Sequence, residues 1–325
     1  MSYQTFAPLF GDETKAIAFV ESLMWPDGPV CPHCGCTEKV WRLKGKTARP
    51  GLWKCGACRL QFTVKIGTIF EDSHLPLSKW LFAIYLMCSS KKGVSANQLK
   101  RELSISYKSA WHLCHRVRLA MTKEPLASKL GAESHVVEID ETFVGGKAKN
   151  KHYDKRKDHG MGTVGKLAVL TLVDRDGEAR TFPVKNTRRS VMFPKIVENI
   201  EGVAHIVTDD HMTYRTLGEH FAGHHYVKHS RGEYVRGLVH TNFAESYHSL
   251  LKRGIMGAYH HISEKHIERY LREFEFKWNS RSISDGERSC EAIKGGKGKR
   301  LMYGRPLITK ENDSSSLRKN KTTAP

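Results

Sequence analysis

The spacing of apolar side chains changes character along this 325-residue chain. Residues 1–70 have short apolar runs separated by turn-forming residues, whereas apolar residues recur at helical spacing in residues 71–122. Between residues 130 and 282, strand-like apolar runs alternate with long helical patterns. Residues 283–325 are rich in Gly and Lys and then polar. The pattern predicts three folded units in these ranges, followed by a basic, disordered tail.

The third unit has a characteristic order of elements. Strands are predicted at HVVEID, KLAVLTLVD and EARTFPVKN, then a helix at SVMFPKIVENI that begins or is interrupted near Pro194. A strand at AHIVTD, a helical stretch, the apolar run HHYVKH and a long helix from HTNFAE follow. The order β-β-β-α-β-α-β-α is expected of a ribonuclease-H-like mixed sheet with flanking helices. We therefore expect an α/β fold, separated from residues 71–122 by a linker that contains Pro125 and Gly131.

The second unit contains a predicted helical hairpin. Residues 95–103 and 107–121 read as helices joined by the turn 104–106, with an apolar seam at Leu99, Leu103, Ile105, Ala110, Leu113 and Val117. Lys108, His112, Arg116 and Arg118 are expected on the exposed part of the second helix. A helix-turn-helix would place that helix in the major groove of DNA. A plain helical hairpin that packs under the next domain fits the same pattern.

Four of the eight cysteines form two Cys-x-x-Cys pairs, which are Cys31 with Cys34 and Cys55 with Cys58. Each pair places two thiolates on one tight turn, and two such pairs complete the tetrahedral sulfur site that Zn²⁺ prefers. Disulfides are disfavoured because we expect no secretory signal at the N-terminus. Cys36 lies close by but breaks the spacing. The sequence therefore predicts a structural zinc site, a small zinc ribbon, within residues 1–70.

The net charge of the chain indicates which kind of molecule it binds. The 53 Lys and Arg exceed the 34 Asp and Glu by 19, and the excess lies in the flanks, whereas residues 131–280 are nearly balanced. So strong a positive field predicts a polyanionic partner, and nucleic acid is the first candidate. No apolar run approaches the roughly 20 residues needed to cross a bilayer. We therefore expect a cytoplasmic, nucleoid-associated protein with no membrane partner.

Three acids occupy corresponding places in the third unit. Asp140 and Asp209 each end an apolar strand run, and Glu245 lies near the start of the long helix. In a ribonuclease-H-like sheet these three carboxylates converge at one edge. Clustered carboxylates repel one another unless cations neutralise them, and oxygen ligands of this kind hold Mg²⁺. Two such ions would support in-line phosphodiester displacement.

The spacing of these acids carries a resemblance. Thirty-five residues separate Asp209 from Glu245, and Lys252 lies seven residues further on. This resembles the DD(35)E signature of insertion-sequence transposases and retroviral integrases, which includes a basic residue two helical turns after the glutamate. Lys252 would share the helix face of Glu245 and contact a substrate phosphate.

Longer motifs extend the resemblance over residues 15–282. A zinc ribbon precedes VEIDETFVGGK, TDDHMTY, HTNFAESYHSLLKRGIMGAYHHIS and HIERYLREFEFKWNSR. This succession is similar to the insertion-sequence 1595 family of bacterial transposases. In that family the third catalytic position is sometimes ascribed to the asparagine of the HTN motif, here Asn242. We favour Glu245 because a carboxylate binds a hard divalent cation better than an amide does.

The expected function is that of a metal-dependent DNA transposase. It would bind the terminal inverted repeats of its own element with the zinc ribbon and the helix-turn-helix. It would then cut and join DNA with Mg²⁺ or Mn²⁺, as a homodimer or larger assembly on double-stranded DNA. Two alternatives stay open: a DNA-binding regulator with a decayed catalytic core, and a ribonuclease-H-like nuclease that does not join strands.

Overall fold

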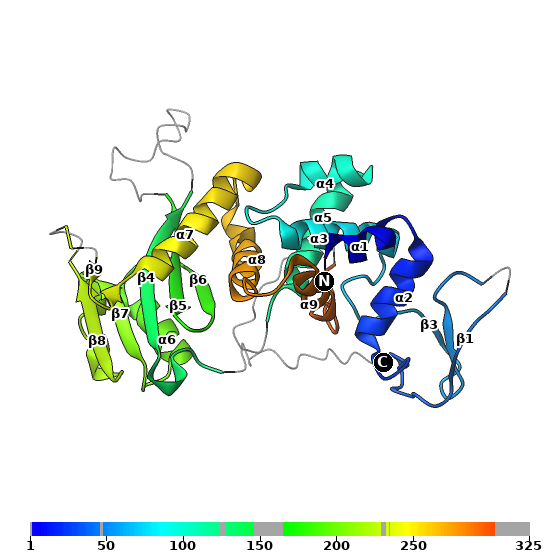
Figure 1. The fold of residues 1–325 in the computed structure, drawn as a ribbon, viewed down its shortest axis with the longest axis horizontal. Coiled ribbons are helices and arrows are strands. Elements are labelled where there is room, and N and C mark those ends of the chain that lie inside the picture. The colour runs from blue at the N-terminus through cyan, green and yellow to red at the C-terminus, as the bar shows by residue number, and fades with distance from the viewer. Residues whose placement is uncertain are drawn as a thin grey trace, which may run out of the picture.

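The computed structural model describes residues 2–45, 48–123, 128–145, 165–228, 232–233 and 235–302. Pro125 and part of the expected linker lie outside these residues. In Figure 1 a large sheet with its helices stands at one end, a bundle of helices lies in the middle, and a small sheet stands at the other end. No helix of the described residues combines the length and the apolar content needed to span a bilayer.

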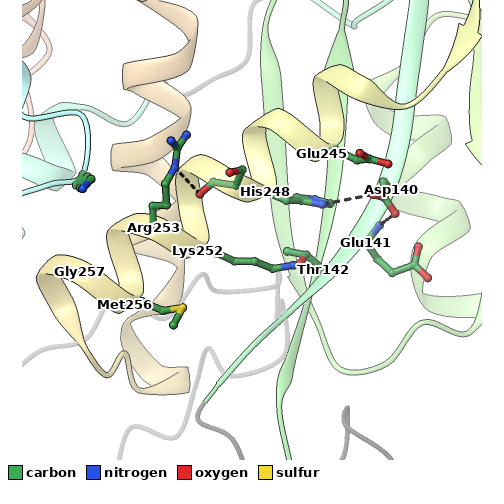
Figure 2. A pocket seen from close by; sticks show the side chains of 11 residues that line it. Asp140, Glu141, Thr142, Glu245, His248, Lys252, Arg253, Met256 and Gly257 are labelled. Atoms are coloured by element: carbon green, nitrogen blue, oxygen red, sulfur yellow. Dashed lines mark hydrogen bonds and ion pairs between the residues drawn. The ribbon is translucent and has the colours of Figure 1, made fainter. Parts of the chain in front are cut away.

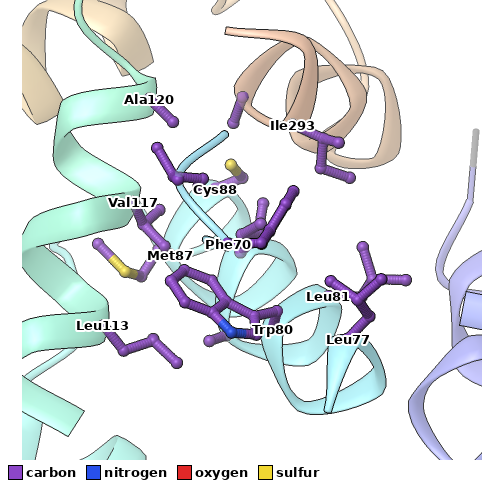
Figure 3. Close-up of a cluster of buried hydrophobic side chains, with 14 of the residues drawn as sticks. Phe70, Leu77, Trp80, Leu81, Met87, Cys88, Leu113, Val117, Ala120 and Ile293 are labelled. Atoms are coloured by element: carbon purple, nitrogen blue, oxygen red, sulfur yellow. The ribbon is translucent and has the colours of Figure 1, made fainter. Parts of the chain in front are cut away.

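The helical bundle draws on more of the chain than residues 71–122. Its helices are α1 (Tyr3–Phe10), α2 (Glu13–Met24), α3 (Leu77–Ser89), α4 (Ala96–Leu103), α5 (Tyr107–Ala120) and α9 (Asp285–Lys294). They share one apolar core, in which Trp80 of α3 packs edge-to-face with Phe70 and lies beside Leu113 of α5 (Figure 3). The expected zinc-ribbon unit of residues 1–70 is therefore too long, because α1 and α2 bury Phe6, Ala16 and Val20 in this bundle core.

The expectation of a disordered tail from residue 283 is wrong for its first part. Ser284 and Glu287 form a reciprocal capping box, which starts α9. Ala292 and Ile293 are then buried in the bundle core, where they pack with α3 and α5. The Gly and Lys content of the following residues hid this amphipathic helix. Residues 303–325 lie outside the described part of the chain.

The hairpin of α4 and α5 has the predicted helices, but its charged face differs from the prediction. Ser95 and Ser106 cap the two helices by accepting hydrogen bonds from the Gln98 and Ser109 backbone N–H groups. Lys108 is exposed in the first turn of α5, whereas Arg116 and Arg118 are buried. The reason is that α5 lies in the centre of the bundle and packs against α8 as well. The start of α5 is exposed, and His112 is half-buried.

The cysteine-bearing unit is a small antiparallel sheet of β1 (Val40–Arg42), β2 (Trp53–Cys55) and β3 (Gln61–Phe62). Its apolar core contains Cys31, Cys55 and Phe62, with Trp25 and Trp53 packed against it. Glu21 of α2 accepts hydrogen bonds from Arg42 and from the Trp53 indole. These contacts fix the small sheet against the bundle.

The large sheet has five strands in the order β6-β5-β4-β7-β8. They are β4 (Val136–Val144), β5 (Leu167–Asp174), β6 (Ala179–Val184), β7 (His205–Asp209) and β8 (Gly223–Val227). β5 is antiparallel to β4 and β6, whereas β7 and β8 run parallel to β4. This mixed sheet confirms the predicted ribonuclease-H-like α/β fold. The helical stretch expected after Asp209 is reduced to short 3₁₀ turns, and a two-stranded hairpin, β9 (Val235–Arg236) and β10 (Val239–His240), precedes α7.

Helices cover the two faces of this sheet separately. Helix α6 (Arg189–Asn199), which contains Pro194, packs through Met192 and Ile196 against one face. Helices α7 (Asn242–Gly254) and α8 (Ile267–Asn279) pack against the other. Because side chains alternate along a strand, the even-numbered residues of β4 face α7 and the odd-numbered ones face α6.

A buried carboxylate fixes the start of α7 on β4. Glu138 has no exposed surface, and its Oε2 accepts hydrogen bonds from the backbone N–H groups of Phe243 and Ala244, at 2.8 and 3.1 Å. Its Oε1 accepts a hydrogen bond of 2.7 Å from Arg175 Nε. A negative charge at a helix N-terminus satisfies free N–H groups and complements the helix dipole. Glu138 therefore sets where α7 begins.

A second buried carboxylate joins the sheet domain to the bundle. Glu273 of α8 accepts hydrogen bonds from Arg118 of α5, Lys277 and Tyr259, at distances of 2.6–2.7 Å. Burial by itself would raise the pKa of Glu273, but Lys277 and Arg118 hold it at about 2. The ionised form is therefore the one that the folded protein binds.

We predict that Glu273→Gln destabilises the protein on the order of 3 kcal/mol at pH 7, because Arg118 and Lys277 lose their buried counter-charge. The folded pKa lies below the ordinary value of 4.5. The stabilisation is thus complete above that value and disappears as the pH falls toward 2. Urea unfolding at pH 7 and near pH 3 measures the difference between wild type and variant. Glu291→Gln, in an exposed pair with Lys294, is the matched control. An effect of Glu273→Gln that does not shrink at low pH contradicts the assignment.

Candidate active site

One cleft of about 700 Å³ lies beside β4 and α7. Its acidic residues are Asp140, Glu141 and Glu245, and its basic residues are Lys92, Lys252 and Arg253. Lys92 belongs to the bundle, whereas the other five belong to the sheet domain. The cleft is therefore lined by both domains.

The register of the sheet places Asp140 and Asp209 side by side. β4 and β7 are parallel neighbours, with Glu138 opposite Val207. The same offset, two residues further on, brings Asp140 opposite Asp209. Asp209 is the last residue of β7, as expected, whereas β4 continues for four residues beyond Asp140 to Val144.

Helix α7 presents one face to these acids. Glu245, His248 and Lys252 follow one another at spacings of three and four residues, so they share a side of the helix. All three line the cleft. In Figure 2 the Glu245 carboxylate lies beside Asp140, and Lys252 extends toward Thr142. Asn242, by contrast, is exposed at the first position of α7 and does not line this cleft.

The carboxylates impose an electrostatic cost on one another. Burial raises the pKa of Asp209, and the charge of Asp140 raises it further, against a hydrogen bond donated by the His211 backbone. Burial likewise raises the pKa of Glu141, with added effects of Asp209 and Asp140. A divalent cation would remove this repulsion, and carboxylate oxygens are the ligands that Mg²⁺ and Mn²⁺ prefer. The chemistry of these donors therefore suits a divalent metal, whereas the ligand atoms of Asp140, Asp209 and Glu245 do not all lie within 4.8 Å of one another in this structure.

Two residues of the site escaped the sequence analysis. His248 is buried, with Nδ1 3.4 Å from Asp140 Oδ2 and Nε2 2.9 Å from the Thr171 hydroxyl. Its position three residues after Glu245 was the available signal. Glu141 accepts a hydrogen bond from the buried Tyr214 hydroxyl on the opposite face of β4. Its signal was adjacency to Asp140, which could not show that strand alternation turns it toward α6.

His240 belongs to the support of the site. Its Nδ1 lies 3.2 Å from Glu138 Oε1, and its backbone carbonyl accepts a hydrogen bond of 2.9 Å from Arg175 Nη2. The histidine of the HTN motif thus joins the buried pair that positions α7.

The four paired cysteines converge as predicted. The Sγ atoms of Cys31 and Cys58 lie 3.7 Å apart, and those of Cys34 and Cys55 lie 3.6 Å apart. These separations are too long for disulfides, whose S–S bond is about 2.05 Å. They match the edge of about 3.75 Å expected for a sulfur tetrahedron with Zn–S bonds of about 2.3 Å. Cys36 lies outside the four-cysteine group.

One cysteine of the group has a lowered pKa, whereas burial and the neighbouring thiols raise the pKa of Cys34 to about 12 and that of Cys58 as well. Hydrogen bonds from the Cys58 and Ala57 backbone lower the pKa of Cys55 to about 6, although burial opposes this. Backbone amides that turn toward sulfur are the environment that a zinc-bound thiolate needs. The geometry and the donors thus fit structural zinc.

Comparisons with known proteins place both of these parts of the chain in transposase families. A family model described as ISXO2-like transposase domain matches residues 132–279, and one described as transposase zinc-ribbon domain matches residues 11–61. A relative from Halobacterium salinarum, described as an uncharacterized protein in transposable element ISH50, is 31% identical over 278 residues. The match covers 82% of this chain and 91% of the relative. The chain therefore belongs to the insertion-sequence 1595 family of transposases.

Proposed function

We propose that the protein binds the inverted-repeat ends of its own insertion sequence, cuts DNA at those ends and joins the freed strand to target DNA. The observation that supports this most directly is the juxtaposition of Asp140 and Asp209 on neighbouring strands, with Glu245 facing Asp140 from α7. Two Mg²⁺ or Mn²⁺ ions held by these carboxylates would activate the attacking hydroxyl and stabilise the leaving oxygen.

The chain's own residues position the reaction. Asp140 is oriented by His248, which is itself held by the Thr171 hydroxyl. Glu138 and Arg175 fix the N-terminus of α7, and this sets the position of Glu245 along the strand direction of β4. Lys252 would bind a phosphate oxygen beside the reacting bond. The reaction needs no covalent intermediate with a protein side chain.

The other two units would bind the element ends. The hairpin of α4 and α5 exposes Lys100, Arg101, Tyr107 and Lys108, a basic surface with an aromatic side chain. Such a surface suits phosphate and groove contacts, as does the basic zinc ribbon. Because two ends must be joined, the working form would be at least a dimer on DNA.

Asp209→Asn should abolish Mg²⁺-dependent end cleavage and joining, because it removes a metal ligand and a charge. The apoprotein should melt a few degrees higher, since a half-buried carboxylate that is repelled by Asp140 is lost. The rise in melting temperature that Mn²⁺ gives the wild type should disappear. Calorimetry with and without Mn²⁺ and a labelled-end joining assay measure these effects.

The adjacent Asp210→Asn variant is the matched control for Asp209, and it should retain both cleavage and the Mn²⁺ response. Specific end binding by the wild type without cleavage in Mg²⁺ or Mn²⁺ would favour a regulator derived from a transposase. Cleavage without joining would favour a nuclease.

Two single substitutions decide whether Glu245 or Asn242 is the third metal ligand. Glu245→Gln should reduce the cleavage rate at least about 100-fold and abolish the Mn²⁺-induced stabilisation, because it removes a charged oxygen ligand. Asn242→Ala should leave that stabilisation in place, since Asn242 lies outside the cleft. The reverse pattern would assign the third ligand to Asn242.

Cys55→Ser should release the zinc and lose specific end binding, because the ribbon depends on its metal to fold. Cys36→Ser should keep one zinc per chain and bind DNA normally. Elemental analysis of the purified variants, together with binding to an element-end duplex, checks both. Equal zinc loss in the two variants would contradict the four-cysteine assignment.

A further inference from the structure

The loop between α3 and α4 carries a lysine from the bundle into the catalytic cleft. Lys92 lies at the tip of this loop and lines the cleft together with Asp140 and Glu245. The loop is closed on itself, because the Gly93 N–H donates to the Ser90 carbonyl at 3.1 Å and the Ser90 hydroxyl donates to the Gly93 carbonyl at 2.8 Å. The tip is therefore a defined turn.

Gly93 allows this turn to pack closely against the sheet domain. Its φ is +91°, which disfavours any residue with a Cβ, and an added Cβ would stand 1.9 Å from the Tyr259 hydroxyl oxygen. That hydroxyl is held in place by its hydrogen bond to Glu273. The loop thus rests on the ion cluster that joins the two domains.

A second close approach lies at the end of α7. A Cβ on Gly254 would meet the Lys92 carbonyl at 2.8 Å and Phe274 at 2.2 Å, so only glycine allows the two backbones to come together. The Lys92 side chain runs beside the π-helical turn Ile255–Tyr259, with Cδ 4.0 Å from the site of a Gly257 Cβ. Its stem is supported while the residue stays exposed.

The positive charge of Lys92 indicates what its position in the cleft can do. Lys92, Lys252 and Arg253 line the same cleft as the carboxylates of Asp140 and Glu245, and none of these cations forms an ion pair with a carboxylate among the described residues. A DNA phosphate that approaches the carboxylates is repelled by them. Cations that line the same cleft, Lys92 from the bundle and Lys252 and Arg253 from α7, would offset that repulsion without forming ion pairs with the carboxylates.

We propose that Lys92 is a DNA-phosphate contact that the helical bundle supplies to the catalytic cleft, and that it grips the strand backbone next to the reacting bond. The proposal rests on the proposed function, since it takes DNA as the substrate of the cleft. The same loop leads within four residues into α4, whose basic side chains Lys100 and Arg101 are exposed. DNA held by the hairpin would pass Lys92 on its way to the carboxylates.

The test compares two neighbouring lysines of one loop. Lys92→Ala and Lys91→Ala remove the same charge from the same turn, but only Lys92 lines the cleft. The probe is a labelled linear DNA duplex of arbitrary sequence, because phosphate contacts are independent of sequence. Binding of the full chain is measured by fluorescence anisotropy in Ca²⁺ from about 50 to about 200 mM salt.

Loss of one phosphate contact should reduce the slope of log K against log salt by about 0.9. Between the lowest and the highest salt concentration, the DNA affinity of Lys92→Ala should therefore decrease by a factor that is about 3.5 times smaller than the factor for wild type. Lys91→Ala should keep the wild-type slope, and Lys92→Arg should restore it. Equal slopes for Lys92→Ala and wild type, or equal losses in both alanine variants, would overturn the proposal.

A footprint that needs no substitution provides the second measurement. Acetylation of exposed lysines by a water-soluble ester, read by mass spectrometry, should label Lys92 in the free protein and spare it when the duplex is bound. Lys91 should be labelled in both states. If the salt slope of Lys92→Ala is reduced and bound DNA protects Lys92 while strand cleavage fails, the phosphate contact is supported and the proposed chemistry is contradicted. If cleavage proceeds and Lys92 stays labelled, the contact alone is disproved.

Discussion

The structure depends on one buried carboxylate, Glu273, which lies where three elements meet. Arg118 arrives from the bundle, Lys277 from the next turn of α8, and Tyr259 from the π-helical turn that ends α7. The Arg118 guanidinium also stacks on the Tyr270 ring, 3.9 Å from its centroid. A buried carboxylate without these donors would carry a large desolvation cost, so the elements that satisfy it are held together. The position of the bundle relative to the sheet follows from this need.

The alternation of β4 organises the site itself. Its even-numbered residues face α7 in succession, with Glu138 at the helix N-terminus and Asp140 beside Glu245 and His248. Its odd-numbered residues supply Val137 and Ile139 to the core under α6, and Glu141 to Tyr214. The segment VEIDE thus uses one carboxylate to set the helix, one to face the cleft and one to hold the opposite layer. The pleat separates Glu141 from the other two acids, and Glu138 and Asp140, which share a face, each have partners of their own in α7.

Patterns that are local or have fixed spacing could be predicted from the sequence. The cysteine pairs, the strand order and the 35 residues between Asp209 and Glu245 are of this kind, and they gave the fold and the acids of the site. Contacts that depend on packing between domains could not be predicted. The sequence pattern placed Arg118 on the exposed side of its helix, but α8 covers it in the structure. Lys92 had no signal at all, because its place in the cleft depends on two glycines that are 161 residues apart in the sequence, Gly93 and Gly254.

Helix α7 connects these observations, because it is fixed at both ends. Glu138 holds its first N–H groups, and the close approach at Gly254 presses its last turn against the Lys92 loop and Phe274. One residue of helical rotation turns a side chain by about 100°, which would carry Glu245, His248 and Lys252 away from Asp140 together. A cap alone fixes where a helix starts but leaves its far end free to tilt. The bundle supplies the second constraint, and it does so through the loop that brings Lys92 to the cleft. The bundle therefore helps to set the geometry of the candidate active site and is also a candidate DNA-binding surface.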